Sequence, residues 1–226
     1  METLIQCKNL IKKYSVGNEN IFALNEASIE IKSGVLTILR GRSGSGKTTM
    51  INQLCLLDKP DSGEIVFDGT DAIKAGDSWR NKCRRQNCGI IFQSVALMPH
   101  MTALENVDFG MRIAGMSSRA RRSHALECLS VVGLSKRASH LPAELSGGEQ
   151  QRVAIARAIA HRPKVIFADE PTAELDTQTG IQVIKVFLDL IEKEGITVVM
   201  TTHDPAFMEL GSNVYTMQDG VITDER

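Results

Sequence analysis

The sequence predicts an α/β fold in which helices cover both faces of a parallel β-sheet, with an antiparallel β subdomain at the N-terminal end and an inserted helical subdomain. Three observations support this fold class. β-rich runs separated by turn residues fill the first 70 residues, buried-type strands alternate with helices after them, and a long helical stretch interrupts that alternation. The chain has 226 residues, of which 42% are hydrophobic and 23% charged, as in globular proteins large enough to bury a core. No repeat or linker divides it, so we expect one domain over residues 1–226, with the helical subdomain at about residues 95–150.

The N-terminal elements are typical of a small antiparallel sheet. We expect strands at residues 4–6, 21–24, 27–31 and 64–67. Asp68-Gly69 after the last run is typical of a tight hairpin turn. Residues 35–39 form a buried-type strand, which leads through a glycine-rich loop into a helix over about residues 47–57.

The rest of the chain alternates helix and buried strand. We expect strands at residues 89–92, 165–168 and 196–201, and helices at about residues 102–132, 146–161 and 177–193. Thr102 and Glu105 have the spacing of a capping box at a helix start. In the last helix, helical spacing predicts a core face made by Ile181, Ile184, Phe187, Leu188 and Ile191.

Charge and hydropathy exclude several classes of function. Lys and Arg number 26 against 27 Asp and Glu, a net charge of −1, so we expect no nucleic-acid partner and only a small or locally held polyanion. No apolar run exceeds four residues, which predicts no direct membrane insertion. The N-terminal residues lack the features of a secretory signal, and five cysteines without a CxxC pair are typical of free cytosolic thiols.

The glycine-rich loop carries the first chemical motif. It fits the pattern GxxxxGK[ST] between a strand and a helix, and reads Gly41-Arg42-Ser43-Gly44-Ser45-Gly46-Lys47-Thr48, followed by Thr49. Its glycines let backbone N–H groups face phosphates, and the helix N-terminus adds its dipole. Lys47 reaches the β- and γ-phosphate oxygens and Thr48 offers a hydroxyl to Mg²⁺, so the sequence predicts a phosphate and magnesium site.

Two carboxylates, Asp169 and Glu170, follow the buried strand at residues 165–168. Open α/β sheets hold their ligands at the carboxyl ends of strands. Asp169 is suited to assist Mg²⁺, while Glu170 is suited to polarise water. Taken alone, two acids after a strand are more typical of a charged helix N-cap, but together with the glycine-rich loop they favour a catalytic pair.

A second anion-binding helix end is predicted at Leu145-Ser146-Gly147-Gly148-Glu149. Ser146 and Glu149 have capping-box spacing, and the two glycines leave N–H groups of the first turn uncovered. Because the chain already carries one complete phosphate cradle, this additional end suggests that it completes the site of a neighbouring chain.

At this point the chain resembles the ATP-binding subunits of ABC transporters over essentially its whole length. The resemblance implies a P-loop NTPase (ABC ATPase) core. Residues 145–152 resemble the family's signature, Gln93 its Q-loop, Ala173-Glu174-Leu175-Asp176 its D-loop and His203 its switch histidine. Tyr14 falls where the family stacks an aromatic ring on adenine. Residues 97–102 with Glu105-Asn106-Val107 are most similar to the macrolide-exporter, lipoprotein-release and cell-division group.

The resemblance also implies roles. Two copies pack head to tail around two ATP molecules, each held by one chain's glycine-rich loop and the other chain's Ser146, Gly147 and Gly148. Gln93 is assigned to Mg²⁺, the attacking water and communication with the membrane subunit, His203 to the γ-phosphate, and Asp176 to the dimer seam. Taken singly, Gln93, His203 and Tyr14 are more typical of structural residues. Glu149 stands where Gln is usual, and Glu174 adds an unusual carboxylate near the seam, where it is positioned to alter coupling between the sites.

We therefore expect an ATP-hydrolysing subunit that powers a separate membrane-spanning permease by ATP-driven dimerisation, on the cytoplasmic face of the membrane. The alternative is a regulatory ABC ATPase that moves no substrate and transmits force to extracytoplasmic enzymes through membrane partners. A soluble ABC protein of DNA repair or translation is disfavoured, because the chain has neither a coiled-coil insertion nor a second cassette. The basic clusters are interpreted as solvated helix faces and comprise Arg80, Lys82, Arg84, Arg85, Arg119, Arg121 and Arg122.

Overall fold

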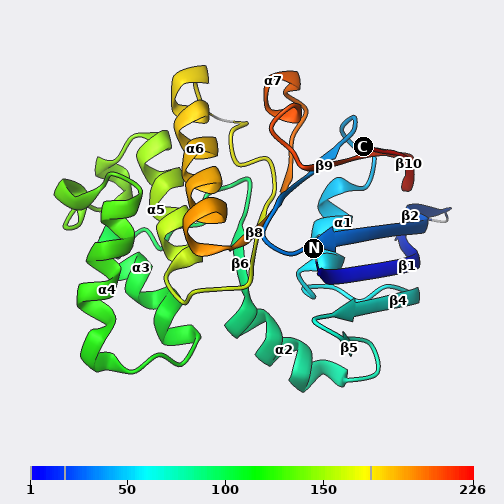
Figure 1. The fold of residues 1–226 in the computed structure, drawn as a ribbon, viewed down its shortest axis with the longest axis horizontal. Helices are drawn as coiled ribbons and strands as arrows, with labels where there is room; N and C mark the ends of the chain where they lie inside the picture. Colours follow the sequence, from blue (N-terminus) through cyan, green and yellow to red (C-terminus); the bar gives the residue numbers. More distant parts are fainter. Residues whose placement is uncertain (1, 18, 174) are drawn as a thin grey trace.

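The computed structural model describes residues 2–17, 19–173 and 175–226, which form two sheets and the helices around them (Figure 1). The strands are β1 Thr3–Val16, β2 Glu19–Lys32, β3 Leu36–Arg40, β4 Ser62–Phe67, β5 Thr70–Asp71, β6 Cys88–Ile91, β7 Val165–Ala168, β8 Thr197–Thr201, β9 Asn213–Gln218 and β10 Val221–Glu225. The helices are α1 Lys47–Leu54, α2 Gly76–Asn87, α3 Ala103–Ile113, α4 Ser118–Val131, α5 Gly147–Ile159, α6 Thr177–Glu194 and α7 Pro205–Met208, with 3₁₀ turns at Ser135–Arg137 and Pro142–Glu144.

The larger sheet has the strand order β10-β9-β3-β8-β7-β6. Its pairs are parallel except for β9 and β10, which are antiparallel at the edge. The smaller sheet, β2-β1-β4-β5, is antiparallel throughout. Both sheets confirm the predicted fold class. In this order β3 and β7 are separated by β8, so the segments that follow these three strands meet at one edge of the sheet.

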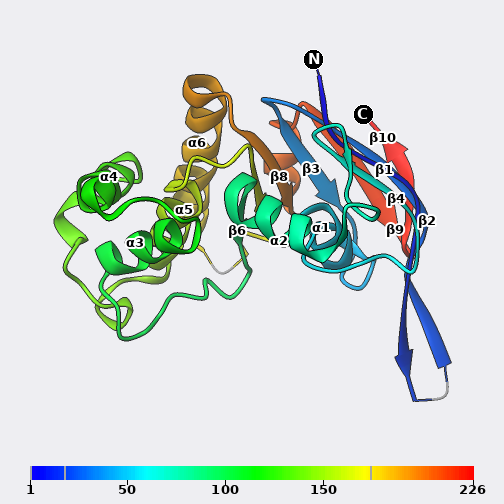
Figure 2. The same ribbon diagram turned by 90° about the horizontal axis from the view of Figure 1, so that it is seen from below.

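Both faces of the larger sheet are buried, as predicted. One face packs on α3, α4, α5 and α6 through side chains such as Ile38, Ile166 and Val198. The opposite face packs on α1 and the antiparallel sheet through neighbouring residues of the same strands, Leu39, Phe167 and Val199. α1 therefore lies between the two sheets, and the β1–β2 hairpin extends beyond them (Figure 2).

Several expected elements differ in their limits. The runs at residues 21–24 and 27–31 belong to one strand, β2, because Glu26 takes a positive φ of 53° where the pairing with β1 shifts, which makes a bulge and not a turn. The turn at Asp68-Gly69 is confirmed, with φ angles of 50° and 75°. The helix expected over residues 47–57 ends at Leu54.

The helical stretch expected over residues 102–132 is two helices, α3 and α4, separated at residues 114–117, where Gly115 has a φ of 83°. The capping box of Thr102 and Glu105 is confirmed at the start of α3. These helices lie at the end of the molecule farthest from the antiparallel sheet (Figure 1). They fall within the predicted helical subdomain, whose limits stay a prediction.

The core face predicted for α6 is partly wrong. Ile181 is 40% exposed, and the buried apolar side chains are those of Val183, Ile184, Phe187 and Leu190. The apolar face of α6 is broad, and its centre is rotated by about one residue from the predicted core face. The sequence pattern also missed α2, where Cys83 is the buried residue among many charged ones, and the terminal strands β9 and β10.

The five cysteines are free, as expected, and all of them are buried. Among the helices within the described ranges, none combines the length and apolarity that a membrane span needs.

Candidate functional site

The glycine-rich loop connects β3 to α1 and takes backbone angles that glycine allows. Gly44 and Gly46 have φ angles of 79° and 100°. A Cβ on Gly46 would overlap the carbonyl oxygen of Ala23, so this position has no room for a side chain. Gly46 is also the N-cap of α1, and no side chain caps that helix start. The first-turn N–H groups of α1 are therefore available to an anion.

Lys47 places a buried cation in this loop. Its side chain is 7% exposed, and its Nζ donates to the carbonyl oxygens of Gly41 at 2.9 Å and Arg42 at 3.1 Å. The same Nζ lies 3.9 Å from Oε1 of Glu170. The ammonium is thus held over the loop by two carbonyls and one carboxylate.

Thr48, Asp169 and Thr201 form a hydrogen-bonded chain between the loop and the neighbouring strand ends. Thr48 Oγ1 donates to Asp169 Oδ2 at 2.8 Å, and Thr201 Oγ1 donates to Asp169 Oδ1 at 2.7 Å. Thr201 Oγ1 also accepts a bond from the backbone N–H of Glu170 at 2.7 Å. Sequence reasoning placed Thr48 and Asp169 in the site and missed the supporting role of Thr201, which depends on β8 lying beside β7.

Glu170 and His203 face each other across the same region. Glu170 has a φ of 45°, an uncommon backbone conformation for a residue that is not glycine. His203 Nδ1 lies 3.6 Å from Glu170 Oε2, and the histidine side chain is 68% exposed. The carboxylate therefore lies between Lys47 on one side and His203 on the other.

A cleft of 670 Å³ brings most of the predicted site residues together. From segments far apart in the sequence it gathers Tyr14, Gln93, Glu170 and His203. From the loop and the start of α1 it includes Gly41, Arg42, Ser43, Gly44, Gly46, Lys47, Thr48 and Thr49. Ser45 is instead 5% exposed beneath the loop, and its Oγ has no hydrogen-bond partner among the described residues.

The hairpin side of the cleft carries residues that sequence reasoning missed. Ile21, Phe22 and Ala23 of β2 line it beside Tyr14. The Tyr14 hydroxyl donates to Asp58 Oδ2 at 3.2 Å. Burial and the negative charge of Asp58 raise the pKa of Tyr14. The sequence indicated only a strand at Ile21 and Phe22, and their exposure beside the cleft depends on the folded protein.

The second helix end, at the start of α5, lies outside this cleft. Ser146 is the N-cap, with its Oγ accepting from the N–H of Glu149 at 3.3 Å, and its own N–H donates to Glu149 Oε2 at 2.9 Å. These bonds confirm the predicted capping box. Arg137 Nε donates to Glu149 Oε1 at 2.9 Å. The backbone N–H of Ser146 is the main reason that the pKa of Glu149 is lowered.

Asp176 is the N-cap of α6 and also lies outside the cleft. Its carboxylate accepts bonds from Thr179, which together lower its pKa. The structure therefore separates the predicted residues into a cleft group, the buried Ser45 and Asp169 beside that group, and a second group made by Ser146, Gly147, Gly148 and Asp176. Glu174 lies outside the described residues.

Comparisons with known proteins agree on one family. A family model described as ABC transporter matches residues 24–173. The chain is 42% identical over 226 residues to the uncharacterized ABC transporter ATP-binding protein MJ0796 of Methanocaldococcus jannaschii, covering 98% of this chain and 96% of that protein. It is 40% identical to the macrolide export ATP-binding/permease protein MacB of Syntrophobacter fumaroxidans, covering 98% of this chain and 31% of that protein. The chain belongs to the ABC transporter family.

A solved structure agrees with this assignment. The dimeric structure of a post-hydrolysis state of the ATP-binding cassette MJ0796, bound to ADP and Pi, matches with a TM-score of 0.91 and 41% identity over 98% of this chain and 97% of that chain. The ABC cassette described here is accordingly an ATP-binding, ATP-hydrolysing subunit, as the sequence predicted.

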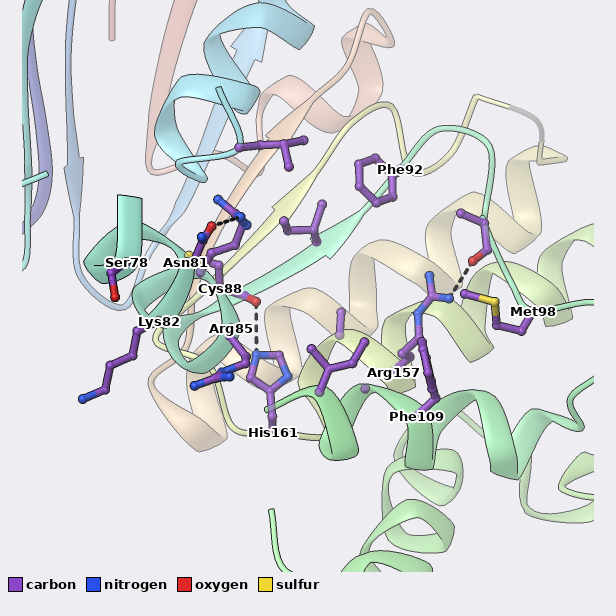
Figure 3. A pocket seen from close by; sticks show the side chains of 17 residues that line it. Ser78, Asn81, Lys82, Arg85, Cys88, Phe92, Met98, Phe109, Arg157 and His161 are labelled. Carbon is purple, nitrogen blue, oxygen red and sulfur yellow. Dashed lines mark hydrogen bonds between the residues drawn. The ribbon is translucent and has the colours of Figure 1, made fainter. Parts of the chain in front are cut away.

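A groove of 820 Å³ lies beside this cleft, between α2 and the helices α3 and α5 (Figure 3). Its apolar lining includes Phe92, Met98 and Phe109, and its basic lining consists of Lys82, Arg84, Arg85 and Arg157. Arg157 donates to the carbonyl oxygens of Ala96 at 2.6 Å and Val95 at 3.2 Å, which fixes the segment after Gln93 against α5. The sequence predicted that the α2 cations are solvated, and Lys82 and Arg85 are exposed at the rim of this groove. Arg80 departs from that prediction, because its side chain is only 12% exposed.

Proposed function

We propose that this ABC ATPase works as a dimer in which each ATP is held by the cleft of one copy and by Ser146, Gly147 and Gly148 of the other. The observation that supports the proposal is the separation, within one chain, of the two helix N-terminal ends that the sequence predicts to bind anions. The start of α1 lies in the cleft, whereas the start of α5 does not line it. A dimer arranged head to tail gives the second end a phosphate to bind.

The residues of the cleft fit a magnesium nucleotide. Within the described residues no group of three or more His, Cys, Asp or Glu is arranged to hold a metal by itself. Mg²⁺ in proteins commonly uses one or two carboxylates together with substrate phosphates and water. Thr48 Oγ1 and Asp169 Oδ2, 2.8 Å apart, supply a hydroxyl and a carboxylate of this kind beside the open start of α1. We propose that they hold Mg²⁺, which when bound neutralises charge on the transferring phosphoryl group.

We assign roles to the other residues of the cleft from their positions. Glu170 lies between Lys47 and His203, so it is placed to accept a proton from water near the γ-phosphate. His203 presents an exposed imidazole to the same space and is proposed to contact that phosphate. Gln93, which follows β6 at the same sheet edge, is proposed to orient the water and the metal ligands. Tyr14, with Ile21 and Phe22 beside it, is proposed to receive the nucleotide base.

The segment after Gln93 offers a route from the nucleotide to a membrane partner. Gln93 lines the cleft, whereas its neighbours Phe92, Ala96 and Met98 line the groove. A change at the cleft that moves this segment therefore also changes the groove. We propose that a separate permease binds here and places the cassette on the cytoplasmic face of the membrane.

The decisive test uses Glu170→Gln, which keeps the shape of the side chain and removes the carboxylate. Hydrolysis is expected to slow by roughly 10²- to 10⁴-fold, the scale of a lost general base, so that the ATP-bound dimer accumulates. Light scattering with ATP and with ADP measures the dimer. A Glu170→Gln protein that binds ATP and stays monomeric at high concentration would contradict the dimer model. Purification of the full chain from native membranes, followed by mass spectrometry, identifies the permease.

A further inference from the structure

The N-terminal ends of α5 and α6 are in contact at Gly148 and Thr179. A Cβ on Gly148 would overlap Cγ2 of Thr179, whereas a Cβ on the adjacent Gly147 would meet nothing within 4 Å. Gly148 therefore lacks a side chain because α6 occupies that space. Gly147 faces open space on the other side of the same helix end.

The opposite side of Thr179 holds Asp176. The Thr179 backbone N–H donates to Asp176 Oδ1 at 3.0 Å, and the Thr179 hydroxyl donates to Oδ2 at 2.6 Å. The same side chain thus touches two segments, with its methyl group on Gly148 and its hydroxyl on Asp176. Nothing in the sequence pattern assigned a role to Thr179.

We propose that Thr179 is a positioning residue that holds the start of α5 and Asp176 as one rigid unit for contact with a second copy of the chain. This inference rests on the proposed function, in which both segments form the dimer seam. A surface that is already ordered loses less conformational entropy on binding, so locking the two segments together favours ATP-driven association. Because the dimer is symmetric, each copy contributes one Thr179. A substitution at this position therefore changes the dimer seam at two places.

A neighbouring contact provides a matched control. Arg152 Nη1 donates to Gln182 Oε1 at 3.0 Å, which joins α5 to α6 about one helical turn farther along. Gln182→Ala removes this bridge without touching Gly148 or Asp176. It therefore reports on general packing between the two helices.

Two substitutions separate the functions of Thr179, each made in the full chain carrying Glu170→Gln. Thr179→Val keeps a methyl group over Gly148 and removes the hydroxyl. Thr179→Ser keeps the hydroxyl and removes the methyl group. We expect Thr179→Val to lower the dimer association constant with ATP by about tenfold, because one hydrogen bond to a carboxylate is lost in each copy. We expect a smaller loss for Thr179→Ser, and unchanged ATP affinity of the monomer for both, since Thr179 does not line the cleft.

A rescue experiment tests the contact with Gly148. Gly148→Ala is expected to abolish dimerisation, because its methyl group collides with Thr179. In the double variant Gly148→Ala with Thr179→Ser the colliding methyl group is gone, and the nearest remaining Thr179 atoms, Cβ and Oγ1, lie at 3.5 and 3.6 Å. Dimerisation is expected to return to the level of Thr179→Ser alone.

A Glu170→Gln parent that does not dimerise with ATP overturns the proposed function, and this inference with it. If the parent dimerises with ATP and the Thr179 variants dimerise equally well, this inference alone is overturned. The same holds if Gln182→Ala weakens the dimer as much as Thr179→Val, or if Thr179→Ser fails to rescue Gly148→Ala.

Discussion

Nζ of Lys47 lies 3.9 Å from Oε1 of Glu170, which joins the cation of the glycine-rich loop to the carboxylate proposed to accept the proton from water. The same ammonium is bound by the carbonyls of Gly41 and Arg42. A phosphate entering the cleft therefore meets a cation whose position is already set by the loop. This arrangement reduces the reorganisation that binding requires.

Lys47→Ala is expected to leave the protein folded and to weaken ATP binding by at least about tenfold, because a charge-assisted bond to phosphate is lost. Isothermal titration with ATP and far-ultraviolet circular dichroism measure the two effects. Lys59→Ala is the control, since Lys59 pairs with Asp77 and does not line the cleft. Unchanged ATP affinity in a folded Lys47→Ala protein would falsify the phosphate assignment.

Ser146→Arg, made together with Glu170→Gln, is expected to prevent the ATP-bound dimer while the monomer still binds ATP. The larger cationic side chain blocks the start of α5, which lies outside the chain's own cleft. Light scattering and nucleotide titration measure the dimer and the binding separately. Ser130→Arg, on the exposed surface of α4, is the matched control. A dimer that persists in the Ser146→Arg protein places the seam elsewhere.

Arg157→Ala is expected to uncouple the groove from the cleft proposed to bind ATP. It removes the two bonds to the carbonyls of Val95 and Ala96. Ala96 is exposed and Val95 is partly buried, so water replaces part of what the two carbonyls lose, and we expect looser residues 95–96 with little change in melting temperature. Hydrogen exchange locates the change and copurification measures permease binding, while ATP affinity is expected to stay the same. Protection at residues 95–96 equal to that of the parent protein would argue against this role.

Glu149→Gln is expected to lower the free energy of unfolding near neutral pH. The backbone N–H of Ser146 lowers the pKa of Glu149 in the folded protein. The stabilisation by the Glu149 carboxylate is therefore fully present above the ordinary glutamate pKa of about 4.3. It is lost as the pH falls through the lowered pKa of the folded protein. The stability difference from the parent protein is therefore expected to shrink below about pH 4. Urea unfolding across pH 3–7, with exposed Glu192→Gln as control, measures it. A difference that is independent of pH would show that the charge of Glu149 does not stabilise the helix start.

The sequence by itself determined what depends on neighbours along the chain. Both capping boxes, at Thr102 and Ser146, were predicted because their partners lie three residues away on one helix turn. The strand at Val165–Ala168 and the loop before Lys47 were likewise predicted, since a run of apolar residues and a glycine pattern act locally. The chemistry expected of Lys47, Thr48 and Asp169 followed from these segments.

Tertiary structure alone decided which segments meet. Thr201 supports Asp169 because β8 lies beside β7, and strand order is not encoded in any local pattern. Tyr14 and His203, far apart in sequence, face one cleft for the same reason. The contact of Thr179 with Gly148 requires α5 and α6 to begin side by side. Local propensity acts over a few residues, whereas these contacts depend on how the whole core packs. The motifs could therefore be predicted from the sequence, and the contacts between them could not.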